Sequence, residues 1–198
     1  MKRLYSYSFY CCLFAGVLLL SSCGTSRRVT KTETNTNTKP AVVQQEPSKK
    51  AIKETYANLM GVTPHDITNY ALYTFIDDWY SVPYKFAGRT KQGVDCSDLV
   101  CILYDKVYGA SLAGNCSTLL SECKPIKQED LKEGDLVFFK INSDNVSHVG
   151  IYLQNNHFVH ASVHKGVVIS NLTDDYYKKY FYKGGRLKVS LTQNTYKG

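Results

Sequence analysis

Four short apolar runs within residues 135–172 constrain the fold more than any other feature of the sequence. Gly, Asn or Ser residues separate these runs, which occupy residues 135–140, 149–153, 158–162 and 167–172. Short runs that alternate with turn residues are typical of β-strands, and Asn155-Asn156 is typical of a hairpin. With a fifth candidate strand at residues 186–189, the sequence predicts an antiparallel sheet.

Helical patterns precede the strands. Between Asp66 and Tyr80, apolar side chains recur at helical spacing, at Ala71, Leu72, Phe75, Ile76 and Trp79. This spacing predicts a helix capped by Asp66, and the apolar stretch from Ser97 to Tyr108, stopped by Gly109, predicts another. Helices followed by an antiparallel sheet are typical of an α+β domain. We therefore expect helices packed on a mainly antiparallel sheet of five to six strands.

The N-terminal segment matches a bacterial lipoprotein signal. Lys2 and Arg3 precede an apolar run at residues 9–20, which is shorter than the roughly 20 residues that span a bilayer. The run ends in Leu20-Ser21-Ser22-Cys23, which resembles a lipobox, the motif whose Cys becomes lipidated. We expect a signal peptide over residues 1–22 and a lipid anchor on Cys23. The alternative is an ordinary secretory signal or an uncleaved anchor.

Residues 23–53 are expected to form a lipidated flexible tether, because polar residues dominate and few apolar side chains are available for burial. The folded domain is then expected to span residues 54–198. Gly24, rather than Asp, follows Cys23, which in enterobacterial lipoproteins is typical of sorting to the outer membrane. We therefore expect a lipid-anchored protein of the bacterial cell envelope, on the outer membrane and facing the periplasm.

The net charge of +7 lies outside the expected domain. Residues 54–198 hold 15 Lys and Arg and 15 Asp and Glu, so their formal charge is zero. A domain without net positive charge has no long-range field that attracts nucleic acid, and we expect no nucleic-acid partner. The basic tether can bind anionic lipid headgroups or serve only as a solvated spacer.

Cys96 is the candidate nucleophile, because it lies at the start of the predicted helix, where free N–H groups stabilise a thiolate. His148 begins one predicted strand and His160 lies in the next, so one imidazole can act as base while the other orients it. Side chains alternate along a strand, so both rings share a face only if the hairpin loop has an odd length or a bulge intervenes. We predict a three-residue loop at Asn155 to His157, or a bulge.

Three further cysteines lie in the expected domain. Cys101 has apolar neighbours and is expected in the core, whereas Cys116 and Cys123 are close enough in sequence to form a disulfide. There is no Cys-x-x-Cys pair and no phosphate-binding Gly loop, so we expect neither a metal nor a cofactor.

Several segments together resemble the NlpC/P60 cysteine peptidases, and among them the lipid-anchored Spr-type murein endopeptidases. In the family's order, these segments are residues 82–88, 93–97, 131–139, 148–152 and 158–162. The resemblance implies a papain-like α+β core, in which the helix that begins at the Cys packs against the sheet carrying both His residues. It also implies a cysteine endopeptidase that hydrolyses peptide-stem or cross-link bonds of peptidoglycan through an acyl-enzyme. We expect a monomer.

The resemblance also implies roles for six residues. The triad consists of Cys96 as nucleophile, His148 as general base and His160 as orienting residue. The implied substrate-binding residues are Tyr84, Asp95 and Ser97.

Two departures from the family pattern bear on activity. Asp98 stands where the family usually has Gly, and a carboxylate that faces the thiol opposes thiolate formation. Residues 113–120 lack the Arg that relatives have here. This segment therefore offers no guanidinium that could bind a substrate carboxylate through two hydrogen bonds. Two other functions stay open, namely a catalytically idle peptidoglycan-binding or scaffold lipoprotein, and an acyltransferase or amidase on the same fold. The tyrosines of residues 176–182 are either half-buried packing or the wall of a glycan groove.

Overall fold

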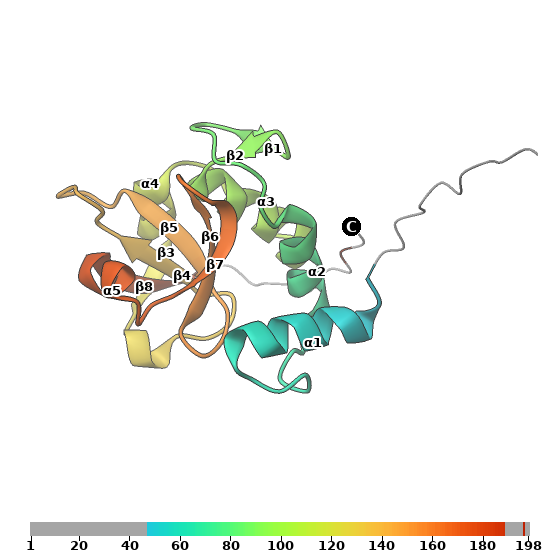
Figure 1. Cartoon of the computed structure of the whole chain (residues 1–198). Helices are drawn as coiled ribbons and strands as arrows, with labels where there is room; N and C mark the ends of the chain where they lie inside the picture. The colour runs from blue at the N-terminus through green and yellow to red at the C-terminus, as the bar shows by residue number, and fades with distance from the viewer. Residues whose placement is uncertain (1–46, 189–195, 197–198) are drawn as a thin grey trace, which may run out of the picture. The chain divides into compact units, whose positions relative to one another are not determined.

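The computed structural model describes residues 47–188 and residue 196. Its centre is a six-stranded sheet in the order β3-β8-β4-β5-β6-β7, in which all neighbouring strands are antiparallel (Figure 1). The strands are β3 (Cys123–Ile126), β4 (Leu136–Phe139), β5 (His148–Tyr152), β6 (His157–Ser162), β7 (Gly166–Asn171) and β8 (Phe181–Leu187). The α+β class and the antiparallel sheet predicted from the sequence are confirmed.

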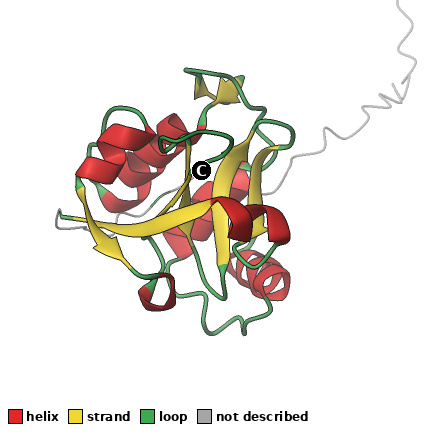
Figure 2. Cartoon of the chain, turned by 90° about the vertical axis from the view of Figure 1, so that its left-hand side faces the viewer, coloured by secondary structure: helices red, strands yellow, loops and turns green. Residues whose placement is uncertain are grey.

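Helices lie on both sides of this sheet. They are α1 (Lys49–Met60), α2 (Tyr70–Trp79), α3 (Cys96–Tyr108), α4 (Cys116–Ser121), α5 (Asp175–Tyr180) and a 3-10 turn, η1 (Gln128–Asp130). Helix α3 packs against β5 and β6, and α1 and α2 pack on each other. In Figure 1, α1 and α2 lie to the right of the sheet and α5 to the left. Figure 2 shows the small ribbon of β1 (Arg89–Thr90) and β2 (Gly93–Val94) at one end of the domain.

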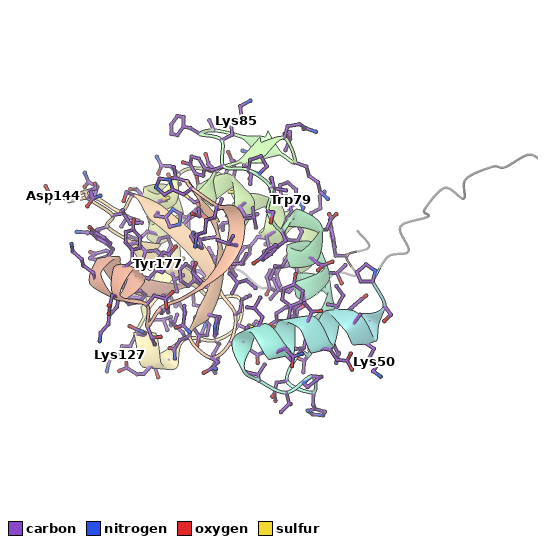
Figure 3. All side chains as sticks on the ribbon, in the orientation of Figure 1. Lys50, Trp79, Lys85, Lys127, Asp144 and Tyr177 are labelled. Carbon is purple, nitrogen blue, oxygen red and sulfur yellow. The ribbon has the colours of Figure 1, made fainter. Side chains whose placement is uncertain are left out.

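The sheet is apolar on both faces. One face contributes Leu136, Phe138, Val149, Ile151 and Val159 to the main core. Residues of the opposite face, among them Phe139 and Phe158, form a second cluster with Tyr177 of α5. Figure 3 places Tyr177 on the α5 side of the sheet and Trp79 on the other. This two-sided burial explains why the strands read as continuous apolar runs.

Helix α1 extends the folded part beyond the expected boundary at residue 54. Ser48 caps it through a hydrogen bond from the backbone N–H of Ala51, and Gly61 ends it in the left-handed conformation. Ile52 and Tyr56, one turn apart, are both buried. Residues 49–53, which the composition assigned to the tether, therefore lie in a helix. The expected signal peptide 1–22, the lipidation site Cys23 and the tether up to residue 46 lie outside the described residues.

The cap of α2 differs from the prediction. Asn69, not Asp66, is the N-cap, and its side-chain oxygen accepts a hydrogen bond from the backbone N–H of Leu72. The carboxylate of Asp66 instead accepts hydrogen bonds from the backbone N–H and the hydroxyl of Thr63, in the turn before the helix. Both residue types favour caps, so the local pattern alone does not distinguish them.

Strand β8 begins earlier than residue 186 because Gly184 and Gly185 are part of it. A Cβ at Gly185 would lie 2.8 Å from Cβ of Cys123, and one at Gly184 would lie 2.9 Å from the carbonyl oxygen of Ile126. The two glycines thus let β3 approach β8 closely, although glycine is unfavourable in a strand by propensity. Within residues 47–188, no helix combines the length and the apolar character needed to cross a bilayer.

Candidate active site

Cys96 is the first residue of α3, and Asp95 is the N-cap. One carboxylate oxygen of Asp95 accepts hydrogen bonds from the backbone N–H of Asp98, at 2.8 Å, and from the hydroxyl of Ser97, at 2.9 Å. The other oxygen accepts a hydrogen bond from the backbone N–H of Ala87, at 3.0 Å. Asp95 therefore joins the preceding loop to the helix and holds the thiol at the helix N-terminus. The helix begins one residue before its predicted start.

Cys116 lies beside Cys96, with 3.7 Å between the two sulfur atoms. It is the first residue of α4, and Asn115 caps that helix. Cys123, considered from the sequence as a disulfide partner of Cys116, instead donates its S–H to the carbonyl oxygen of Leu119. All four cysteines of the described part are free, and Cys101 is buried in the core as predicted.

The two neighbouring thiols have opposite pKa shifts. The hydrogen bond from Cys116 makes the largest contribution to a lowered pKa of Cys96. Hydrogen bonding and charge from His148 and a hydrogen bond from the backbone N–H of Val149 act in the same direction, while burial opposes them. The contact with Cys96, together with burial, raises the pKa of Cys116. Cys96 is therefore the thiolate of the pair and Cys116 the thiol that donates to it.

His148 and His160 are hydrogen-bonded, with 2.8 Å between Nε2 of His148 and Nδ1 of His160. Burial, together with the charges of His148 and Lys165, holds the pKa of His160 well below its ordinary value, so this ring is neutral. Its Nε2 lies 3.0 Å from Oγ of Ser170 and 3.1 Å from the hydroxyl oxygen of Tyr177. With its proton on Nε2, His160 donates toward these hydroxyls and accepts a hydrogen bond from His148 at Nδ1.

The hairpin loop explains why both rings lie on one face. The backbone N–H of Leu153 donates to the carbonyl oxygen of His157, so the loop consists of the three residues Gln154 to Asn156. Asn155 and Asn156 adopt positive φ angles of 47° and 61°. The predicted odd-length loop is confirmed, and it lies one residue earlier than expected because His157 already belongs to β6.

Two cavities adjoin these groups. A cavity of about 230 Å³ holds the thiol and the three expected substrate-binding side chains, and its lining includes Tyr84, Asp95, Cys96, Ser97 and Cys116. A larger cavity of about 480 Å³ lies on the imidazole side, and its lining includes His148, His160, Lys165, Ser170 and Tyr177. All six sequence-predicted site residues of the domain therefore line one cavity or the other.

Comparison with known proteins identifies the family. The model of the NlpC/P60 family matches residues 81–186, which is more than half of the chain. The chain belongs to the NlpC/P60 family. The match contains the thiol, both imidazoles and the residues of both cavities that are named above.

Curated relatives of this NlpC/P60 chain are named as endopeptidases. It is 32% identical over 176 residues to murein DD-endopeptidase MepS/murein LD-carboxypeptidase of Escherichia coli K12, covering 87% of this chain and 88% of the relative. It is 39% identical over 113 residues to the "Probable endopeptidase NlpC" of the same strain, covering 57% of this chain and 73% of the relative. A solved NLP/P60 family structure from Staphylococcus aureus matches with a TM-score of 0.54 and 28% identity, over 59% of this chain and 40% of that one.

Asp98, which departs from the family pattern, forms an ion pair in this NlpC/P60 domain. Its carboxylate lies 2.7 Å from the guanidinium of Arg89 on β1, and its side chain is 13% exposed. Burial and the charges of Asp95 and Cys96 raise its pKa, while Arg89 opposes the rise. Arg89 therefore compensates the carboxylate that the sequence places two positions after Cys96. No sequence signal linked the two residues.

Sequence reasoning missed three site residues of this NlpC/P60 domain. Cys116 was considered only as a disulfide partner, and Ser170 and Tyr177 only as part of a strand and of a tyrosine cluster. The ring of Tyr177 packs on Phe139 and Phe158, as the packing alternative for that cluster predicts, and its hydroxyl contacts His160. Between residues 47 and 188, no cluster of three or more His, Cys, Asp or Glu side chains is arranged to hold a metal ion.

Proposed function

We propose that the chain is a cysteine endopeptidase that hydrolyses peptide-stem or cross-link bonds of peptidoglycan. The observation that carries the proposal is the 2.8 Å contact between His148 and His160, next to the Cys96 thiol, whose pKa His148 helps to lower. A thiolate beside an imidazole that a third group orients is the arrangement needed for nucleophilic catalysis. The substrate class is supported by the family and by relatives named as murein endopeptidases.

In the proposed reaction, the thiolate of Cys96 attacks the carbonyl carbon of the scissile amide. The backbone N–H of Cys96 helps to bind the oxyanion that forms. The imidazolium of His148 then donates its proton to the leaving amine, which leaves an acyl-enzyme. His148 next takes a proton from water, the hydroxide attacks the thioester, and the acid product leaves as the thiolate is restored. His160 stays neutral and holds the ring of His148 in place.

Tyr84, Asp95 and Ser97 are proposed to bind the substrate, since they share the cavity of the thiol. Asp95 already accepts three hydrogen bonds from Ala87, Ser97 and Asp98. A carboxylate has about four acceptor positions, so one is left for a substrate donor such as an amine. The proposed site therefore favours a substrate group that carries N–H donors at this position.

We also propose that Cys23 carries a lipid and that the domain faces the periplasm from the outer membrane as a monomer. The proposal rests on the lipobox-like Leu20-Ser21-Ser22-Cys23 and on Gly24. Metabolic labelling with an alkyne fatty acid is expected to mark the wild type and not Cys23→Ser. Labelling of both proteins would contradict the anchor.

The peptidase proposal is tested with the full chain, purified in detergent and incubated with muropeptides. Mass spectrometry of the products is expected to show new amine and carboxyl ends with the wild type and with the control Cys101→Ala, but not with Cys96→Ala. Equal cleavage by Cys96→Ala would overturn the proposal. Binding without cleavage by the wild type would support the idle scaffold, and products with a transferred acyl group would support the acyltransferase.

A further inference from the structure

The two thiols of the site are close enough to become bonded to each other. The sulfur atoms of Cys96 and Cys116 lie 3.7 Å apart. A disulfide bond is about 2.05 Å long, so the atoms must approach by roughly 1.7 Å. Each sulfur is carried by one rotatable bond at the first residue of its helix, and α3 and α4 are in contact. Side-chain rotation can therefore supply much of this movement.

The other two cysteines of the described part lack these properties. Burial raises the pKa of Cys101 to about 11 and that of Cys123 to about 12, so both stay protonated. Neither lines the cavity that holds Cys96 and Cys116. Among the four, only Cys96 combines thiolate character with a cavity that admits a small oxidant, and Cys116 is its thiol neighbour.

We propose that Cys96 and Cys116 form a reversible disulfide that blocks the site when the protein meets a peroxide. The disulfide follows from the placement of two thiols. Only its consequence, loss of peptidase activity, rests on the proposed function.

The chemistry balances with hydrogen peroxide as the oxidant. The Cys96 thiolate attacks one peroxide oxygen, and the O–O bond breaks to give a sulfenic acid and hydroxide, which takes a proton from the solvent and becomes water. The Cys116 sulfur then attacks the sulfenic sulfur, so that the S–S bond forms and a second water leaves with the Cys116 proton. The two thiols lose two electrons in total, and the peroxide gains them. The hydrogen bond that raised the pKa of Cys116 ends when Cys96 is no longer a thiolate, which helps this second step.

The disulfide removes the nucleophile without destroying it. A lone sulfenic acid is oxidised further to a sulfinic acid, which is irreversible for most proteins. With Cys116 beside it, the sulfenic acid is consumed instead, and a dithiol restores both thiols by exchange. The cell envelope, in which we propose that the chain acts, is a compartment where disulfides persist.

The test detects the disulfide itself by peptide mass spectrometry and does not depend on peptidase activity. The full chain, purified in detergent, is treated with hydrogen peroxide, alkylated and digested with trypsin. Residues 92–106 then form one peptide, with Cys96 and Cys101, and residues 107–127 form another, with Cys116 and Cys123, because the Lys124-Pro125 bond resists trypsin. We expect the two peptides to be joined, with fragmentation locating the bond at Cys96 and Cys116, and to separate after treatment with dithiothreitol.

Two variants distinguish a specific disulfide between Cys96 and Cys116 from non-specific oxidation of the cysteines. Cys116→Ser is expected to abolish the joined peptides and to leave Cys96 with two or three added oxygen atoms. Cys101→Ala, changed in the same peptide as Cys96, is expected to form the joined peptides as the wild type does. The proposal is overturned if Cys96 of the wild type gains oxygen atoms without joining Cys116, or if the bond joins Cys101 or Cys123.

Muropeptide cleavage, measured in parallel, separates the two proposals. We expect cleavage by the wild type to fall in proportion to the fraction of joined peptides and to return with dithiothreitol. In Cys116→Ser, the loss after peroxide is expected to be permanent. A disulfide that forms in a protein with no cleavage activity even when reduced would overturn the proposed function and leave the modification site standing.

Discussion

The imidazoles of His148 and His160 meet edge to face, with 2.8 Å between Nε2 of one and Nδ1 of the other. β5 pairs with β6 at Ile151 and Val159, and Gly150 and His160 are the next residues along the two antiparallel strands. A Cβ at Gly150 would lie 2.8 Å from the carbonyl oxygen of Val159 and 3.2 Å from Cβ of His160. The contact between the imidazoles therefore depends on a close strand approach that a glycine permits.

Replacing Gly150 by Ala is expected to weaken both the fold and the site. The added methyl group displaces backbone as well as the ring of Phe158, and overpacking of this kind costs about 1–3 kcal/mol of unfolding free energy. Because β6 carries His160, its displacement also lengthens the contact with His148. Urea unfolding and muropeptide kcat/KM measure the two effects. A variant with wild-type kcat/KM at reduced stability would show that the strand spacing does not control the site.

Replacing His160 by Ala is expected to lower kcat/KM by roughly 10²-fold, since a base without its orienting partner loses much of the gain from general acid–base catalysis. His160→Gln keeps a hydrogen-bonding side chain and is expected to retain part of the activity. His65→Ala is the control, because His65 is exposed in the segment between α1 and α2. Equal kcat/KM for His160→Ala and the wild type would remove His160 from the proposed triad.

Local patterns were enough to select Cys96, His148 and His160 as candidate site residues, and the local geometry of each explains why. Cys96 begins a helix whose apolar spacing and final Gly109 are contiguous in the chain, and the faces of His148 and His160 depend on one short loop. By contrast, the contact of Cys96 with Cys116 depends on the path of the irregular segment between α3 and α4, which brings the start of α4 next to the start of α3. An irregular segment has no periodic sequence pattern from which this path could be predicted.

The hydroxyls around His160 show the same limit. Ser170 on β7 and Tyr177 on α5 meet at one ring nitrogen only because the sheet and the helix pack there. Ser and Tyr are common in strands and at partly buried surfaces, so neither residue has a distinguishing sequence signal. Helix α1 was missed for another reason, because its polar composition matches a tether and only the buried stripe with Ile52 and Tyr56 shows the fold.

Removal of both hydroxyls near His160 is expected to cost more than removal of either one. Ser170→Ala and Tyr177→Phe each leave one oxygen within reach of Nε2 of His160, whereas the double variant leaves this N–H without a partner. A buried unpaired donor costs about 1–3 kcal/mol. We therefore expect small single effects and a larger double effect, both on kcat/KM and on urea unfolding. Strictly additive effects on both measurements would contradict a shared role at this nitrogen.

Asp95 is expected to matter for stability as well as for substrate. Its loss as the N-cap of α3 costs about 0.5–2 kcal/mol, and the contact with Ala87 N–H is lost too. Asp95→Ala should therefore lower the unfolding free energy by about 1–3 kcal/mol, whereas Asp95→Asn keeps one acceptor and should lower it less. Urea denaturation checks the order of the two variants. An Asp95→Ala protein as stable as the wild type would contradict the predicted contribution of Asp95 to stability, and only its proposed role in substrate binding would remain.

The pH dependence of Cys96 reactivity is expected to depend on Cys116. The S–H of Cys116 donates to the Cys96 thiolate and makes the largest contribution to its lowered pKa. Only the thiolate reacts, so reactivity rises as pH increases through this pKa, and a lowered pKa places that rise at lower pH. Cys116→Ala removes the donor, raises the pKa and moves the rise to higher pH. Cys116→Ser keeps a donor and should move it less.

The rate of iodoacetamide alkylation at Cys96, followed by peptide mass spectrometry across a pH series, measures these shifts without any substrate. Cys123→Ala is the matched control, because Cys123 donates to the carbonyl oxygen of Leu119 and not to the site. Its profile should coincide with that of the wild type. An unchanged profile for Cys116→Ala would mean that His148, the backbone N–H of Val149 and the helix N-terminus hold the thiolate without Cys116, since those are the other groups that favour it.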